Sequence, residues 1–287
     1  MQGHGQTGQQ ENQEPARGQI QDQARAPDEH GRRARWGAAG RQVYARAALA
    51  AGAAGKVLAG ARELLLPSAC ALCGAVQRQV VCTDCAADLL PAVRRCPACA
   101  LALGRHFHCP ACAASPPAFD HAHTLGDYAS PQDQLVLALK FGHALPLAGW
   151  LAARLAAGLP GAWAGARQAP PDLIAPVPLS PQRLAARGFN QAWEIARPLA
   201  RHLGLRADPV LLQRQRDTGS QRALDLAARQ VNLRGAFRLT RAARLDGLHV
   251  ALVDDVMTSG ATLHEAASVL KAHGAACVSV IVALRTP

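Results

Sequence analysis

The chain has few aromatic residues and no long uninterrupted apolar run. Phe, Trp and Tyr make up 4% of its 287 residues. The first thirty residues are polar and Gln-rich, without the apolar segment of a secretory signal. The most apolar early stretch, 47–66, is interrupted by Lys56, Arg62 and Glu63, whereas a membrane-spanning helix needs about 20 predominantly apolar residues. We therefore expect a cytoplasmic protein without a membrane span.

Acidic residues are scarce relative to basic ones. The chain carries 31 Lys and Arg against 20 Asp and Glu, a formal net charge of +11. Such an excess favours partners that carry phosphate, either nucleic acid or small phosphorylated metabolites, and does not choose between them. An Arg-rich solvated surface without such a partner is the alternative interpretation.

Composition divides the chain into four segments. Residues 1–42 lack hydrophobic periodicity and are predicted to be a disordered tail, and the Ala/Leu pattern of 43–66 predicts a helix that ends before Pro67. Residues 67–117 hold eight of the nine cysteines, and 118–287 alternate segments of strand and helix type. We expect a small metal-binding domain followed by an α/β domain, in an oligomeric state that the sequence leaves open.

The α/β domain is predicted to contain a parallel sheet, because strands that alternate with helices are joined by right-handed crossovers. The predicted strands are 122–128, 173–177, 249–253 and 276–284. The predicted helices are 132–141, 147–157, 181–203 and 261–273, and the Gly- and Pro-rich segment 158–171 is predicted to be a loop.

The most informative segment follows the predicted strand 249–253. Two adjacent carboxylates, Asp254 and Asp255, come directly after it, at the edge where parallel sheets bind ligands. A turn then opens the next predicted helix, and its residues are Thr258, Ser259, Gly260, Ala261 and Thr262. Gly allows a close backbone approach, while the hydroxyls and the helix N–H groups favour a phosphate. A Walker-type loop is excluded because no Gly-Lys-Ser/Thr follows.

The paired acids would repel a phosphate ligand unless they met hydroxyl groups or a cation. Carboxylates accept hydrogen bonds from the vicinal hydroxyls of a ribose, directly or through Mg²⁺ and water. Hydroxyls at Asp254 and Asp255, together with phosphate at the turn, describe a ribose 5-phosphate. An ordinary strand-to-helix turn with Asp caps is the alternative.

This segment resembles the phosphoribosyl diphosphate (PRPP) signature of type I phosphoribosyltransferases. The resemblance implies the fold of that family, a parallel sheet flanked by helices. It also implies that Asp254 and Asp255 are the catalytic, ribose-binding acids and that 258–262 cradles the 5-phosphate. In that family Mg²⁺ and basic groups stabilise the leaving diphosphate, while carboxylates support a positively charged ribosyl transition state.

Two further segments carry side chains suited to a diphosphate. The first is a Pro-rich loop after the predicted strand 173–177, and its candidates are Pro178, Leu179, Arg183 and Arg187. The second is a polar, Gly-containing segment, as expected of a mobile lid over an anionic substrate, and its candidates are Arg216, Gln221 and Arg229. The alternatives are a helix with solvated arginines and a plain surface loop.

The order of these motifs resembles a narrower family, ComF (competence protein F), over about residues 62–285. The motifs are Lys140-Phe, Pro176-Val-Pro-Leu, Arg187-Gly-Phe-Asn-Gln, Arg216-x-Thr-x-x-Gln and Arg229-x-x-Asn, preceded by paired cysteines. The resemblance implies that loop 176–180 lies at the diphosphate site and that 216–229 covers the active site. It also implies a role in DNA uptake during natural transformation.

Eight cysteines form four CxxC pairs within 43 residues, and they are Cys70, Cys73, Cys82, Cys85, Cys96, Cys99, Cys109 and Cys112. Two such pairs supply the four thiolates of one tetrahedral Zn²⁺, so the eight suit two structural ions in a double zinc ribbon. The spacing leaves open whether adjacent or alternate pairs share an ion. His106 and His108 are expected to be bystanders, and disulfides are the less favoured alternative.

Two functions from different classes fit these observations. One is an Mg²⁺-dependent transferase that uses PRPP and an unidentified acceptor. The other is a non-catalytic DNA-processing or interaction protein that uses the same fold as a nucleotide-binding scaffold. Single-stranded DNA or DNA-uptake proteins are the partners that the second hypothesis predicts.

Overall fold

The computed structural model describes residues 68–90, 93–106, 109–166, 168–216, 234–240 and 244–287. The chain divides into two units, 1–50 and 51–287, and all described residues belong to the second. The predicted tail 1–42 and helix 43–66 therefore lie outside the described residues, as do Gln221 and Arg229 of the predicted lid.

A parallel sheet of five strands organises the α/β domain, as predicted. In spatial order the strands are β3 (His121–Asp127), β9 (Cys277–Arg285), β8 (His249–Met257), β4 (Leu173–Pro176) and β5 (Arg206–Ala207). Every neighbouring pair in this sheet is parallel. The longest strands, β8 and β9, lie at its centre and are buried along nearly their whole length, which suits their run of β-branched apolar residues.

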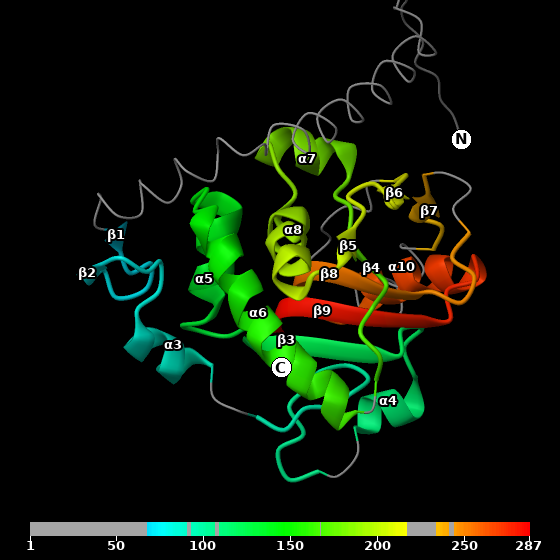
Figure 1. The fold of residues 1–287 in the computed structure, drawn as a ribbon, viewed down its shortest axis with the longest axis horizontal. Helices are drawn as coiled ribbons and strands as arrows, with labels where there is room; N and C mark the ends of the chain where they lie inside the picture. Colours follow the sequence, from blue (N-terminus) through cyan, green and yellow to red (C-terminus); the bar gives the residue numbers. More distant parts are fainter. Residues whose placement is uncertain (1–67, 91–92, 107–108, 167, 217–233, 241–243) are drawn as a thin grey trace, which may run out of the picture. The chain divides into compact units, whose positions relative to one another are not determined.

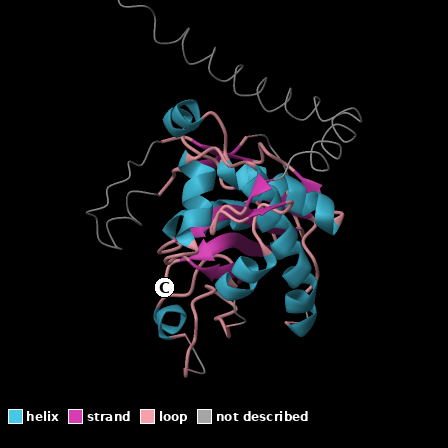
Figure 2. Cartoon of the chain, turned by 90° about the vertical axis from the view of Figure 1, so that its left-hand side faces the viewer, coloured by secondary structure: helices cyan, strands magenta, loops and turns pink. Residues whose placement is uncertain are grey.

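Helices cover both faces of the sheet. Those on one face are α5 (Asp133–Phe141), α6 (Pro146–Gly165) and α8 (Gln191–Leu203), and α10 (Ala261–Ala272) lies on the other. Figure 1 shows α6 and α8 crossing the near face, and Figure 2 shows helices on both sides of the strands. The domain is thus a three-layer α/β structure, with its carboxyl-end loops free to carry a ligand site.

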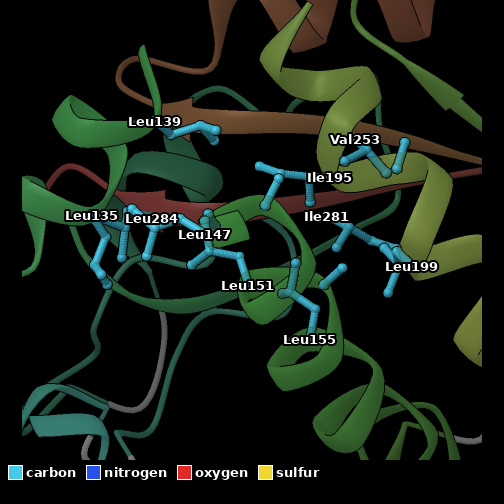
Figure 3. Close-up of a cluster of buried hydrophobic side chains, with 14 of the residues drawn as sticks. Leu135, Leu139, Leu147, Leu151, Leu155, Ile195, Leu199, Val253, Ile281 and Leu284 are labelled. Atoms are coloured by element: carbon cyan, nitrogen blue, oxygen red, sulfur yellow. The ribbon is translucent and has the colours of Figure 1, made fainter. Parts of the chain in front are cut away.

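The larger hydrophobic core lies between the sheet and the helices of its near face. Figure 3 shows leucines of α5 and α6 in one cluster with Ile195 and Leu199 of α8 and with Val253 and Ile281 of the central strands. These side chains are at most 3% exposed. A side chain carried by α5 is therefore held in a fixed position relative to β8.

The predicted loop 158–171 is wrong, because α6 continues through Pro160 to Gly165. Proline removes one intrahelical hydrogen bond and crowds the preceding turn. The apolar stripe nevertheless continues through Leu155, Leu159 and Trp163, each at most 6% exposed. Burial of that stripe outweighs the local breaker signals.

The predicted helix 181–203 is two helices, α7 (Pro181–Arg187) and α8. Gly188 ends α7 with a left-handed φ of 80°, a conformation that glycine adopts without strain. Asn190 then starts α8, and its Oδ1 accepts a hydrogen bond from the Ala192 N–H at 3.0 Å. A C-cap and an N-cap in succession turn the chain between the two helices.

The remaining described elements are short. The cysteine-rich segment holds β1 (Ser68–Ala69), β2 (Val76–Gln77), α3 (Thr83–Leu89) and α4 (Pro110–Ala114). An antiparallel ribbon of β6 (Leu212–Arg214) and β7 (Phe237–Leu239) forms the base of the predicted lid. Among the described residues, no helix combines the length and the apolarity that crossing a membrane requires.

Buried imidazoles lie at the opposite, amino end of the sheet. The His249 Nε2 is 2.7 Å from the Ser279 Oγ, and the Gln168 amide donates to the same oxygen at 2.7 Å. Burial lowers the pKa of His249, and burial followed by the neighbouring His121 lowers the pKa of His123 to about 4. Both imidazoles are therefore neutral in the folded protein at pH 7.

We expect the free energy of unfolding to fall as the pH decreases from about 6.5 towards 4. In this window the unfolded chain takes up protons that folded His123 excludes, so protonation favours unfolding. Urea unfolding of the wild type should lose about 1–2 kcal/mol between pH 7 and pH 5 from His123 alone. The His123→Leu variant should lose correspondingly less, and equal losses in the two proteins would contradict this account.

Candidate functional site

Asp254 and Asp255 were predicted to follow a strand, but they lie within strand β8. Strand β8 continues to Met257, and its pairing with β9 aligns Asp254 with Val282 and Val256 with Leu284. The predicted end at Val253 is therefore wrong. Because successive side chains of a strand point to opposite faces, the two carboxylates of Asp254 and Asp255 meet different surroundings.

Asp255 is held by an ion pair. Its Oδ2 lies 2.6 Å from the Nζ of Lys140, near the end of α5, and the two side chains are 4% and 19% exposed. Its Oδ1 accepts a hydrogen bond from the Val256 N–H at 2.8 Å. Lys140 was not predicted as a site residue, although it is the one basic residue in the otherwise apolar segment 135–141.

Asp254 has a different environment. Its Oδ1 accepts a hydrogen bond from the Asp255 N–H at 2.9 Å. Burial, and then the negative charge of Asp255, raises the pKa of Asp254 well above its ordinary value. A ligand that donates hydrogen bonds to such a carboxylate, or that brings a cation next to it, stabilises its ionised form.

The predicted turn leads from β8 into α10. Gly260 has a φ of 80° and precedes the first helical residue, Ala261. The Ser259 Oγ accepts a hydrogen bond from the Ala261 N–H at 3.4 Å, and the Gly260 carbonyl accepts from the His264 N–H at 2.8 Å. The first-turn N–H groups of a helix have no intrahelical acceptors and attract anions. Residues 258–262, which carry these N–H groups and the hydroxyls of Thr258 and Thr262, are the candidate anion cradle.

The loop after β4 leaves the same edge of the sheet. Pro176 pairs with Val253 of β8, so Pro178 and Leu179 follow at the level of the acids. Asn190 is 3% exposed, and its Nδ2 donates to the Val177 carbonyl at 3.1 Å. The fully buried Ser180 accepts from the Arg183 N–H at 3.3 Å. These two side chains hold the loop at both ends.

Arg187, at the end of α7, faces α5. Its guanidinium carbon lies 5.6 Å from the ring centre of Phe141, and its Nη1 donates to the Gln191 Oε1 at 2.5 Å. Arg183 lies on the same helix, one turn before it. Arg187 thus lies against the end of α5 that carries Lys140.

The base of the predicted lid joins α10. The Gly235 N–H donates to the Glu265 Oε1 at 2.6 Å, and the Gln215 N–H donates to the Ala236 carbonyl at 2.8 Å. The Arg216 guanidinium donates to the Arg234 carbonyl. Arg216 is therefore at the foot of the segment that carries Gln221 and Arg229, which lie outside the described residues.

The eight cysteines of the CxxC pairs form two groups. Adjacent pairs come together, so the first group is Cys70, Cys73, Cys82 and Cys85 and the second is Cys96, Cys99, Cys109 and Cys112. Within each group all sulfur atoms lie within 4.8 Å of one another. None of these eight cysteines is joined in a disulfide in the structure.

The sulfur spacing fits tetrahedral zinc. A Zn–S bond of about 2.3 Å implies neighbouring sulfurs about 3.8 Å apart. The sulfur–sulfur separations are 3.8 Å for Cys73 and Cys82, 3.6 Å for Cys99 and Cys109, and 3.9 Å for Cys96 and Cys112. Each group could hold one ion with a closed shell, a structural rather than catalytic coordination. His106 is exposed and belongs to neither group, and His108 lies outside the described residues.

Comparison with known proteins identifies a domain family and relatives of the chain. Residues 190–287 match the family model of the phosphoribosyl transferase domain. DNA utilization protein YhgH of Salmonella typhi is 36% identical over 236 residues, covering 78% of this chain and 99% of that protein. Competence protein F of Haemophilus influenzae is 33% identical over 168 residues, covering 58% of this chain and 73% of that protein.

Among solved structures, the purine phosphoribosyltransferase of Pyrococcus horikoshii aligns with 48% of this chain and 83% of its own, with 18% identity and a TM-score of 0.29. The domain match and the parallel sheet with helices on both faces confirm the predicted phosphoribosyltransferase fold.

Replacement of the two acids by asparagine should affect stability in opposite ways. Asp255→Asn leaves the ammonium of Lys140 without its counter-charge, and breaking a buried pair costs about 3 kcal/mol. Asp254→Asn keeps the acceptor for the Asp255 N–H and removes a carboxyl group whose ionisation is disfavoured, so stability at pH 7 should be equal or higher. Urea unfolding measures both.

A double variant serves as the control for the ion pair. Lys140→Met with Asp255→Asn removes both charges and should recover a large part of the stability that Asp255→Asn loses. If the double variant were as unstable as the sum of its single changes, the pair would not hold α5 to β8.

We expect two zinc ions per chain, one for each group of four thiols. Elemental analysis of the purified protein should give a ratio near two, and Cys109→Ser, in the second group, should lower it towards one. Cys73→Ser is the matched change in the first group. A wild-type ratio of one, or a simultaneous loss of both ions from either variant, would contradict two independent sites.

Proposed function

We propose that this chain, which belongs to the competence protein F (ComF) family, binds the Mg²⁺ complex of PRPP or a related ribose 5-phosphate ligand. The observation that supports this most is the junction of β8 and α10. There a buried strand presents Asp254, and a left-handed Gly260 opens a helix N-terminus directly beyond it. Asp254, which would bind the hydroxyls, and the helix N-terminus, which would bind the phosphate, are thus separated only by the turn that joins β8 to α10.

The 5-phosphate would lie in the anion cradle. Residues 258–262 offer main-chain N–H groups at the start of α10 and the hydroxyls of Thr258, Ser259 and Thr262. Phosphate oxygens are strong acceptors and gain from the positive end of the helix dipole. No other residue is needed to explain an affinity for a phosphate monoester at this edge.

The ribose hydroxyls would bind Asp254. Because Lys140 balances the charge of Asp255, Asp254 is the carboxylate that remains for the ligand. Hydrogen bonds from vicinal hydroxyls stabilise its ionised form. Asp254 would also hold Mg²⁺, directly or through water, and the metal would add positive charge at the leaving diphosphate. Asp255 would act mainly by fixing the strand end against α5.

The diphosphate would lie between the loop after β4 and the lid. Pro178 and Leu179 lie in a loop whose two ends are held by hydrogen bonds of Asn190 and Ser180. The arginines expected to approach are Arg183, Arg187, Arg216 and Arg229, with Gln221 as an amide donor. Guanidinium groups bind phosphate oxygens in pairs of parallel hydrogen bonds. Closure of the lid would exclude water from the ribosyl centre.

We also propose a link to DNA uptake or utilisation. The names of the two relatives refer to DNA utilisation and competence, and the formal charge of +11 favours contact with nucleic acid. Single-stranded DNA or DNA-uptake proteins are the partners that this link implies. The ligand site and the DNA role are compatible, because a phosphoribosyl ligand can regulate as well as react.

One observation favours the alternative of a scaffold without turnover. A ribosyl transition state carries positive charge, which carboxylates support. Here the ammonium of Lys140 offsets one of the two adjacent carboxylates at 2.6 Å. This arrangement suits ligand binding better than it suits bond cleavage. Under the scaffold hypothesis the same site binds the ligand, but no ribosyl group is transferred.

Calorimetric titration with Mg²⁺ and PRPP tests the ligand. We expect saturable binding by the wild type and at least about tenfold weaker binding by Asp254→Asn, because a hydrogen bond to a charged group contributes about 1.5–3 kcal/mol. Asp133→Asn, which changes an acid at the other end of α5, is the control and should bind like the wild type. Absence of wild-type binding, or equal affinity of Asp254→Asn, would refute the proposed site.

Release of diphosphate from PRPP, followed in the same samples with added bases or amines, separates the two hypotheses. Release that depends on an acceptor and is lost in Asp254→Asn supports the transferase. Tight binding without release under any acceptor supports the scaffold.

A further inference from the structure

Arg285 is a buried arginine at the end of β9 that reaches the start of the anion cradle. The residue is 7% exposed. Its Nη1 donates to the main-chain carbonyls of Met257 at 3.2 Å, Thr286 at 2.6 Å and Thr258. Met257 ends β8 and Thr258 begins the cradle, so the guanidinium fixes the backbone where the strand becomes the loop.

The same side chain reaches the second cysteine group. Its Nε donates to the carbonyl of Cys99 at 3.1 Å. Cys99 is one of the four thiols grouped with Cys96, Cys109 and Cys112. One guanidinium thus joins a metal-binding turn to the phosphate-binding loop, through atoms of the main chain at both ends.

The second cysteine group is docked on the sheet by further contacts. The Ala122 N–H of β3 donates to the Pro97 carbonyl at 2.8 Å. Ala100 is 1% exposed and belongs to the core cluster that contains Met257. Arg95 Nη1 lies 2.6 Å from the Asp127 Oδ1, at the end of β3. The turn around Cys99 is therefore a fixed surface against which Arg285 can hold the loop.

The charges agree with this arrangement. Burial lowers the pKa of Arg285, and the nearby thiols of Cys99, Cys112 and Cys109 act in the opposite direction. Four thiolates around one divalent ion leave a net charge of about −2. That negative charge would stabilise the buried guanidinium of Arg285. Without the metal, the turn would no longer hold the Cys99 carbonyl in the position where it accepts the hydrogen bond from Arg285.

The first cysteine group provides a contrast. Among the described residues, hydrogen bonds within its own segment run from the Cys82 N–H to the Cys70 Sγ at 3.4 Å and from the Ala71 N–H to the Val80 carbonyl at 2.8 Å. Cys70 and Val81 pack into the core cluster of α5 and α6. This group is the matched comparison for any effect of metal loss.

We propose that Arg285 is a positioning residue that couples the second cysteine group to the anion cradle. Metal in that group holds the Cys99 carbonyl, Arg285 transmits the position to Met257 and Thr258, and the cradle keeps its ligand-binding conformation. Loss of that metal then weakens the binding of a ribose 5-phosphate ligand, whereas loss of metal from the first group does not act through this contact. The part that concerns ligand affinity rests on the proposed function.

Hydrogen exchange without any ligand tests the coupling directly. In the full-length, zinc-loaded protein, Arg285→Gln should speed the exchange of amides 257–264 by about tenfold or more, because it removes hydrogen bonds from a charged donor. Arg95→Gln is the control, since it removes the contacts of Arg95 with Asp127 of β3 and with the Ala100 carbonyl next to Cys99, and leaves the contacts of Arg285 with Met257 and Thr258 in place. Equal exchange of amides 257–264 in the two variants overturns the proposal.

Metal loss is tested in the same way. Cys109→Ser should speed the exchange of the same amides, and Cys73→Ser should not. In the Arg285→Gln background, Cys109→Ser should add little, because the two changes interrupt one connection. Additive effects of Arg285→Gln and Cys109→Ser would overturn the coupling. If Arg285→Gln does not fold, Arg285→Lys keeps the charge without the planar fork and should show a smaller effect in the same direction.

Titration of the same variants with Mg²⁺ and PRPP links the coupling to the ligand. We expect Kd to rise about tenfold or more in Arg285→Gln and to stay within about twofold of the wild type in Arg95→Gln. Absence of wild-type binding would refute the proposed function and leave the exchange result to decide the coupling. Unchanged affinity of Arg285→Gln, with normal binding by the wild type, would refute the role of Arg285.

Discussion

The ion pair between Lys140 and Asp255 is the contact on which the candidate site depends. Two adjacent carboxylates at the end of a buried strand repel each other and lose hydration, so one needs a counter-charge. The ammonium lies 2.6 Å from Asp255. Leucines of α5 that are fully buried in the core hold this helix, and with it the backbone of Lys140, against the sheet. In the proposed site Asp254 is then the carboxylate left for the ligand.

The second cysteine group and the α/β domain are joined at the edge of the sheet where the strands have their carboxyl ends. Arg285 contacts the cradle on one side and Cys99 on the other, and Arg95 joins the second cysteine group to Asp127. One of these arginines belongs to strand β9 and the other to the cysteine-rich segment, so the contacts between the two parts come from both sides. The second cysteine group is therefore packed against the edge of the sheet that carries the candidate site, although a closed shell of four thiolates would give it no catalytic position.

The sequence was sufficient to predict what periodicity and composition determine. The alternation of strands and helices, the eight cysteines as ligands for two ions and the turn that opens a helix after the paired acids follow from local patterns. The continuation of α6 through Pro160 could not be predicted, since it depends on burial of Trp163 in the assembled core. The contacts of Lys140 and Arg285 join residues 115 and 28 positions apart in the chain, so no local pattern reveals them. The grouping of adjacent CxxC pairs likewise required the folded chain.

The central claim is that the carboxyl end of β8 binds a ribose 5-phosphate. A crystal structure of the full chain with Mg²⁺ and PRPP, or with ribose 5-phosphate, tests it most directly. The account predicts the 5-phosphate on the N–H groups at the start of α10 and the ribose hydroxyls on Asp254, with the Lys140–Asp255 pair intact. A phosphate bound elsewhere, or a ribose held by Asp255 after displacement of Lys140, would contradict it.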